Sequence, residues 1–145
     1  MEKIHTHSVR VYYENTDTGG IVYHADYLGF AERARTEMLR AHGFEHAQLL
    51  KETGVAFAIR HIDIDYKRSS VLDDMLDIET TLTRMGGASF DMKQVFKHNG
   101  EAIVEMKVVL VCMDTTSLSA TRIPEYLRTL FGKLLIDKTK EVINV

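Results

Sequence analysis

A carboxylate beside two glycines is the group in this sequence best placed to do chemistry. Asp17 precedes Gly19 and Gly20, and a helical apolar pattern begins a few residues later. The first N–H groups of a helix lack internal partners and carry partial positive charge, so they can stabilise an oxyanion. A nearby carboxylate can attack the same carbonyl or deprotonate a water, and glycines let a ligand approach the backbone. The alternative is that Asp17 only caps a turn, as aspartate often does.

A strand and a long helix flank this polar loop. Alternating residues predict a short, half-buried strand over 9–13, which ends at the turn-forming run 15–20. From about Tyr23 to His42 the apolar residues recur at helical spacing, and Gly43 follows as a C-cap. A second, short helix is expected from Glu45 to Glu52.

The rest of the chain alternates in the way that strands do. Apolar residues occupy odd positions over 55–59 and even positions over 62–66, which requires a bulge or bend near Arg60 and His61. Further alternating runs predict strands over 76–82, 90–96 and 102–112, with a tight turn at Asn99–Gly100. One strand, one long helix and four strands predict an α+β fold, a five-stranded antiparallel sheet against one helix. A dimer is expected, because the sheet's other face needs cover.

Composition is that of an ordinary soluble domain. The chain has 145 residues, of which 18 are basic and 21 acidic, so no basic excess indicates a nucleic-acid partner. We expect a single domain over 1–145, whose last part, about 124–145, is a short helix and a tail. No apolar run approaches the roughly 20 residues of a membrane span, and the first residues do not resemble a signal peptide. The expected location is therefore the cytoplasm.

Residues 11–27 resemble the signature of hotdog-fold acyl-CoA thioesterases of the 4-hydroxybenzoyl-CoA thioesterase type. Their continuation, 30–40, is similar to the YbgC branch, thioesterases associated with the bacterial Tol-Pal system, and the resemblance extends over 66–74 and 102–114. It implies a hotdog fold paired across a dimer. It also implies an enzyme that hydrolyses an acyl-CoA to a free acid and a thiol.

By this resemblance, Asp17 matches the catalytic carboxylate, as either nucleophile or general base. The backbone N–H of His24 matches the donor that polarises the thioester carbonyl, while the role of its imidazole stays open. Members of the branch commonly carry aspartate where this chain has Asn15. Because Asp17 remains, Asn15→Asp is expected to retain activity.

The candidate substrate-binding residues lie near the helix start and after the strand at 62–66. They are Gly19, Gly20, Tyr23, Tyr27, Lys67 and Arg68. The resemblance places the two tyrosines in the pocket wall, whereas the two basic residues either contact the phosphates of coenzyme A or form an ordinary strand end. No metal or redox cofactor is implied, since neither histidine pair has a third ligand beside it. Coenzyme A is part of the substrate.

Two other functions compete with hydrolysis. A hotdog hydratase or dehydratase needs a paired acid and base, and no second motif accompanies Asp17. A non-catalytic acyl-thioester-binding scaffold need not keep a carboxylate at this position. The resemblance further implies a homodimer or homotetramer, and Tol-Pal-associated or lipid-synthesis partners.

Overall fold

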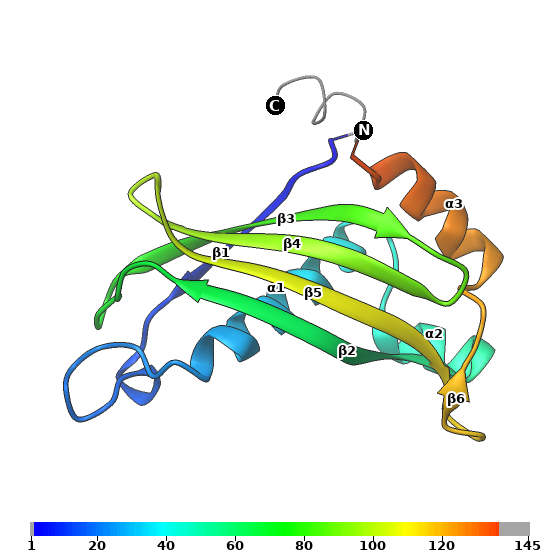
Figure 1. The fold of residues 1–145 in the computed structure, drawn as a ribbon, viewed down its shortest axis with the longest axis horizontal. Helices are drawn as coiled ribbons and strands as arrows, with labels where there is room; N and C mark the ends of the chain where they lie inside the picture. Colours follow the sequence, from blue (N-terminus) through cyan, green and yellow to red (C-terminus); the bar gives the residue numbers. More distant parts are fainter. Residues whose placement is uncertain (1, 137–145) are drawn as a thin grey trace.

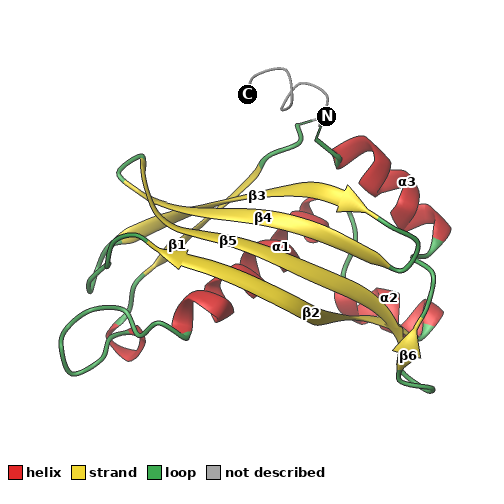
Figure 2. Cartoon of the chain, in the orientation of Figure 1, coloured by secondary structure: helices red, strands yellow, loops and turns green. Residues whose placement is uncertain are grey.

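A curved antiparallel sheet forms one layer of the molecule, and the long helix α1 packs across one of its faces (Figures 1 and 2). The computed structural model describes residues 2–136. Within them the strand order is β1-β3-β4-β5-β2, with a short β6 beside β5. The strands are β1 His5–Arg10, β2 Val55–Tyr66, β3 Met75–Met85, β4 Ser89–His98, β5 Glu101–Asp114 and β6 Ser119–Ala120. The predicted architecture is confirmed, and β6 is added to it.

The helices lie close to their predicted bounds. They are α1 Asp26–Ala41, α2 His46–Thr53 and α3 Glu125–Leu134, with a 3-10 turn η1 at Tyr13–Asn15. α1 begins later than predicted because residues 23–25 form a turn, in which the Asp26 N–H donates to the Tyr23 carbonyl at 2.9 Å. Pro124 is the N-cap of α3, as its fixed φ favours. Residues 137–145 of the predicted tail lie outside the described part of the chain.

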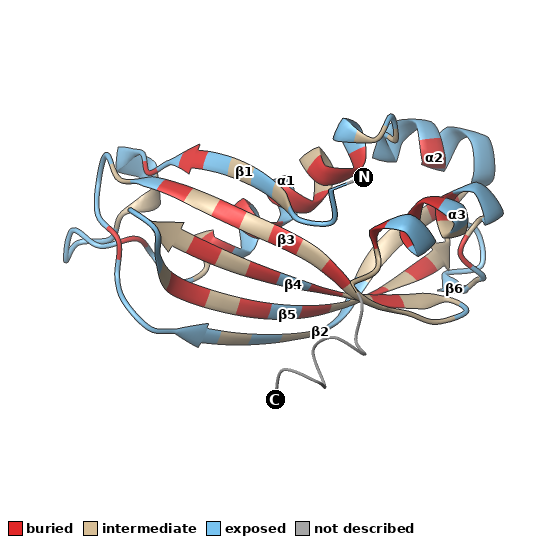
Figure 3. Ribbon diagram, turned by 90° about the horizontal axis from the view of Figure 1, so that it is seen from above, coloured by how far each residue is buried: buried red, intermediate tan, exposed pale blue. Residues whose placement is uncertain are grey.

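The core lies between α1 and the inner face of the sheet. On β3 every second residue from Leu76 to Leu82 is buried and the residues at 77, 79 and 81 are partly exposed, which Figure 3 shows as alternating bands. On α1, Phe30, Ala34 and Met38 form part of the buried stripe. Each large side chain buried in this way contributes about 1.5–3 kcal/mol, which holds the helix against the sheet.

The predicted bulge in β2 is present. The register of β2 against β5 shifts between Ile59 and His61. Before the shift Phe57 pairs with Cys112, and after it Ile64 pairs with Met106, so both β2 residues lie on the inner face. The bulge therefore lets one long strand keep its apolar residues on the helix side throughout.

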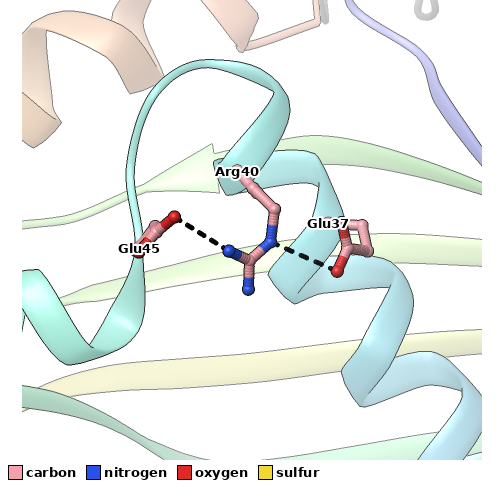
Figure 4. A network of polar contacts seen from close by, with 3 residues as sticks. All are labelled: Glu37, Arg40 and Glu45. Atoms are coloured by element: carbon pink, nitrogen blue, oxygen red, sulfur yellow. Dashed lines mark hydrogen bonds and ion pairs between the residues drawn. The ribbon is translucent and has the colours of Figure 1, made fainter.

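A short turn joins α1 to α2 and is held by charged side chains (Figure 4). The Arg40 guanidinium contacts Glu37 at 3.3 Å and Glu45 at 2.9 Å. Gly43 has a φ of +84°, a conformation that L side chains disfavour. These exposed ion pairs add little stability, about 0–1 kcal/mol each, but they link the end of α1 to the start of α2.

The first strand differs from the prediction of 9–13. It ends at Arg10, and the chain turns into η1 because the Asn15 side chain accepts a hydrogen bond of 2.8 Å from the Tyr12 N–H. The Asn15 amide also donates to the Asp26 carboxylate at 2.9 Å. One side chain thus ties the turn before the loop to the first residue of α1.

This contact predicts a cost for Asn15→Asp. The new carboxylate would face the Asp26 carboxylate in place of an N–H donor, which we expect to lower stability by about 1–3 kcal/mol. The exchange Asn15→Asp/Asp26→Asn restores one donor and one acceptor and should recover most of the loss. Urea unfolding of the two variants measures this, with Asp26→Asn as the control. Equal stability of Asn15→Asp and the wild type would contradict the proposed contact.

Candidate active site

Residues 15–23 form a tight hairpin that presents Asp17 near its tip. The Tyr23 N–H donates to the Asn15 carbonyl, and the Asp17 N–H donates to the Ile21 carbonyl, each at 2.9 Å. Gly20 closes the turn with a φ of +83°. The carboxylate of Asp17 is therefore exposed on a backbone that hydrogen bonds hold in place.

The Asp17 carboxylate has one oxygen engaged and one free of described partners. Its Oδ1 accepts a hydrogen bond of 2.8 Å from the Gly19 N–H, which is the turn-capping contact that aspartate commonly makes. No described residue donates to Oδ2. A Cβ at Gly19 would lie 3.2 Å from Oδ1, closer than side chains normally pack, so glycine suits this position. Turn capping and chemistry are compatible, because each can use a different oxygen.

His24 lies in the turn before α1, two residues ahead of the first helical residue. Its backbone N–H has no acceptor among the described residues. Its carbonyl accepts a hydrogen bond of 3.1 Å from the Tyr66 hydroxyl at the end of β2. Its imidazole ring packs against the Tyr23 ring, with 4.5 Å between the ring centroids. The predicted oxyanion donor is thus an unpaired N–H on an exposed turn, although it precedes the helix proper.

Tyr27 supports this region from inside the core. Its side chain is 3% exposed, and its hydroxyl shares a hydrogen bond of 2.7 Å with Ser70 Oγ. Burial raises the pKa of Tyr27. The Ser70 carbonyl in turn accepts from the Val22 N–H at 2.9 Å, which ties the hairpin to the loop after β2. Tyr23, by contrast, is exposed, so a pocket-lining role is open to Tyr23 without rearrangement.

The two basic residues predicted to meet coenzyme A are both engaged with carboxylates. Lys67 contacts Glu105 at 3.2 Å, and Arg68 contacts Glu101 at 3.0 Å, each pair lying at the surface. Exposed pairs of this kind are weak, so a phosphate can compete for the cations. Their role in binding stays a prediction.

A cavity of about 470 Å³ lies between α1, α2 and the first half of β2. We call it the α2 cavity. Its apolar walls include Leu39, Leu49, Val55, Phe57, Phe90 and Leu110. Its volume is within the range of small-molecule sites, but Asp17 is not part of it. Figure 1 places the loop of Asp17 and helix α2 at opposite ends of α1. The cavity is not visible in the sequence, because alternation indicates which faces are buried but not the gaps between them.

Other reactive groups are poor candidates for catalysis. Burial raises the pKa of the Cys112 thiol to about 11, so at neutral pH it is not a thiolate. In residues 2–136 no group of three or more His, Cys, Asp or Glu side chains is arranged to hold a metal ion. The described helices include none with the length and apolar character to cross a membrane.

Known families and structures match the chain over most of its length. The model of the thioesterase-like superfamily matches residues 11–131. A probable thioesterase from Bartonella henselae has 36% identity and a TM-score of 0.79, covering 83% of this chain and 99% of its own. A 1,4-dihydroxy-2-naphthoyl-CoA thioesterase from Synechocystis, 19% identical, shares the fold with a TM-score of 0.83, covering 90% of this chain and 97% of its own.

Two curated relatives are closer in sequence. The acyl-CoA thioester hydrolase YbgC of Escherichia coli is 44% identical over 118 residues, which span 81% of this chain and 87% of the relative. The acyl-CoA thioesterase YbgC of Haemophilus influenzae is 40% identical over 126 residues, spanning 87% and 93%. The predicted resemblance and hotdog fold are thereby confirmed: the chain belongs to the thioesterase-like superfamily, as a YbgC-type thioester hydrolase.

Proposed function

We propose that the chain hydrolyses acyl-CoA thioesters to a free acid and coenzyme A, with Asp17 as the catalytic carboxylate. The observation that carries this is that one exposed segment presents both an Asp17 carboxylate oxygen and a His24 N–H, neither of which has a hydrogen-bond partner within residues 2–136. The YbgC relatives, named as acyl-CoA hydrolases, support the substrate class. The cytoplasm is the proposed location, and the free, buried Cys112 suits a reducing compartment.

The reaction follows from what each group can do. The thioester carbonyl oxygen accepts a hydrogen bond from the His24 N–H, which stabilises the negative charge that develops on attack. Asp17 either attacks the carbonyl carbon itself or takes a proton from the attacking water. The carbon–sulfur bond then breaks and coenzyme A leaves as its thiolate. In the first route a water afterwards cleaves the mixed anhydride between Asp17 and the acyl group.

A second copy of the chain completes this site in our proposal. β2 is an edge strand, hydrogen-bonded within residues 2–136 to β5 alone, and Ile59 and Tyr66 on it are 50% and 45% exposed. The unpaired N–H and C=O groups along a long edge strand can pair with the edge of another chain. Cyclic dimers are the commonest symmetric assemblies.

Twofold pairing of β2 with its copy also brings the two halves of a site together. In an antiparallel pair the first residues of one strand lie beside the last residues of the other. The first half of β2 lines the α2 cavity, and its last residue, Tyr66, contacts His24. The α2 cavity of one protomer would therefore lie beside the Asp17 loop of its partner, and the acyl group would occupy that cavity. Tol-Pal-associated or lipid-synthesis partners, and a tetramer, stay expectations from the family resemblance.

Asp17→Asn should reduce kcat by roughly 10²–10⁴-fold while the fold and assembly are kept. The amide is nearly isosteric, but it neither accepts a proton from water nor forms the anhydride effectively. Thiol release from a panel of acyl-CoAs measures the loss. Asp73→Asn is the matched control: Asp73 has a φ of +73°, which asparagine tolerates, and lies in the neighbouring loop. Near-normal turnover by Asp17→Asn would overturn the assignment.

One turnover in H₂¹⁸O with enzyme in excess tests for the direct route. If Asp17 attacks the thioester and water then cleaves the anhydride at the Asp17 carboxyl carbon, ¹⁸O enters Asp17 and the released acid is unlabelled. General-base catalysis places ¹⁸O in the acid, and so does cleavage of the anhydride at the acyl carbonyl, so ¹⁸O in Asp17 is the outcome specific to direct attack. Mass spectrometry of the acid and of the peptide containing Asp17 reads the outcome.

Mixing inactive variants tests the shared site. We pair Asp17→Asn with Ala47→Trp, which fills the α2 cavity from its exposed α2 side. After random exchange, half of the dimers are mixed and each holds one intact site, so about one quarter of wild-type activity should return. Gln48 is the next residue and is not part of the cavity lining, so the control variant Gln48→Trp should be active without a partner variant. Absence of recovery after verified exchange would place the whole site within one chain, and a fully active monomer in sedimentation would overturn the dimer.

A further inference from the structure

Arg35 on α1 is a buried cation without a carboxylate partner among residues 2–136. It is only 7% exposed. Its Nη1 donates a hydrogen bond of 2.9 Å to Gln94 Oε1, which is the one hydrogen bond that the guanidinium makes to a described residue. Three other arginines, Arg40, Arg68 and Arg84, each form an ion pair with a carboxylate although they are far more exposed. The least solvated of these four arginines is therefore the one whose charge is not neutralised.

A neutral amide oxygen is an incomplete partner for a buried guanidinium. Arginine stays protonated and offers five N–H donors in a planar fork, which matches the two oxygens of a carboxylate. Burying a charge costs free energy unless the charge is paired and its donors are satisfied. The arrangement around Arg35 thus leaves room for an anionic acceptor.

The α2 cavity is where such an acceptor can reach Arg35, because Arg35 is part of its lining. The other ionisable lining residues are Glu32 and His46. Desolvation lowers the pKa of His46 below its usual value, which disfavours the charged imidazolium. Glu32 attracts Arg35 but is exposed to solvent, where its charge is screened, and it forms no ion pair with Arg35. The buried charge of this cavity is therefore positive.

We propose that Arg35 is a specificity-determining residue that selects acyl groups carrying a carboxylate at the end distant from the thioester. The carboxylate lies in the α2 cavity and pairs with the guanidinium, while the apolar walls cover the methylene chain between the two ends. This rests on the proposed function, in which the α2 cavity of one protomer holds the acyl group attacked at Asp17 of the other. An unsubstituted alkyl tail fits the walls but leaves the cation unpaired.

The experiment compares each acid with its own neutral ester. Glutaryl-CoA and adipoyl-CoA are measured against their monomethyl esters, both as kcat/KM for the wild type and as binding to Asp17→Asn by calorimetry. A charge-assisted pair predicts a preference of about 10- to 100-fold for the acid. Arg35→Met should abolish the preference, and Arg35→Lys should keep part of it. Arg33 lies on the exposed face of the same helix, so Arg33→Met is the matched control and should keep the full preference for the acid.

The ratio of acid to ester is taken on one preparation, so a partly folded variant does not distort it. A wild type that prefers the ester, or an Arg35→Met variant that keeps the acid preference, overturns the proposal. If Arg35→Met does not fold, the acid-to-ester ratios of the wild type and of Arg35→Lys test the proposal. A wild type without an acid preference, or an Arg35→Lys variant with an undiminished one, would overturn it. Turnover that survives Asp17→Asn would contradict the proposed function instead, while the calorimetric preference would still test Arg35.

Discussion

The buried amide of Gln94 is the contact on which the placement of α1 depends. Its nitrogen donates to the Ala31 carbonyl at 3.0 Å and to Thr80 Oγ1 at 3.1 Å, and its oxygen accepts from Arg35. The apolar stripe of α1 turns one face of the helix toward the sheet, and these hydrogen bonds fix the position along that face. A shift of one residue along α1 would turn the helix by about 100° and leave these buried polar groups unpaired. The hydrogen bonds therefore select one register of the helix.

That register has consequences at both ends of α1. At its start, the turn with His24 and the hairpin with Asp17 lie beside the end of β2, joined by the Tyr66 hydroxyl. Toward its other end, Arg35 lines the α2 cavity. In one chain the two ends are separated by the length of the helix. In the proposed dimer, antiparallel pairing at the β2 edge would bring the cavity of one protomer to the Asp17 carboxylate of the other. Chemistry and selectivity would then come from different protomers.

The loop around Asp17 is polar and exposed, yet it is held by defined contacts. Backbone hydrogen bonds close the hairpin, Ser70 holds it from the core side, and Asn15 links it to Asp26. A carboxylate on such a loop remains accessible to a substrate while its position is restricted. Preorganisation of this kind lets a group act without reorganising during the reaction.

The sequence alone was sufficient for α1, the four long strands after it, the bulge and the family. Period-two alternation and helical spacing depend on which face is buried, so they predicted the strands, α1 and the change of face near Arg60. A long local motif marked Asp17 and His24. The same local patterns placed the first strand wrongly, because Asn15 turns the chain through a side-chain contact that alternation does not encode. Only the tertiary structure identified the α2 cavity and showed that Arg35 has no carboxylate partner within residues 2–136. Both depend on which side chains meet across α1, β2 and β4, and residues that are distant in sequence meet only when the chain is folded.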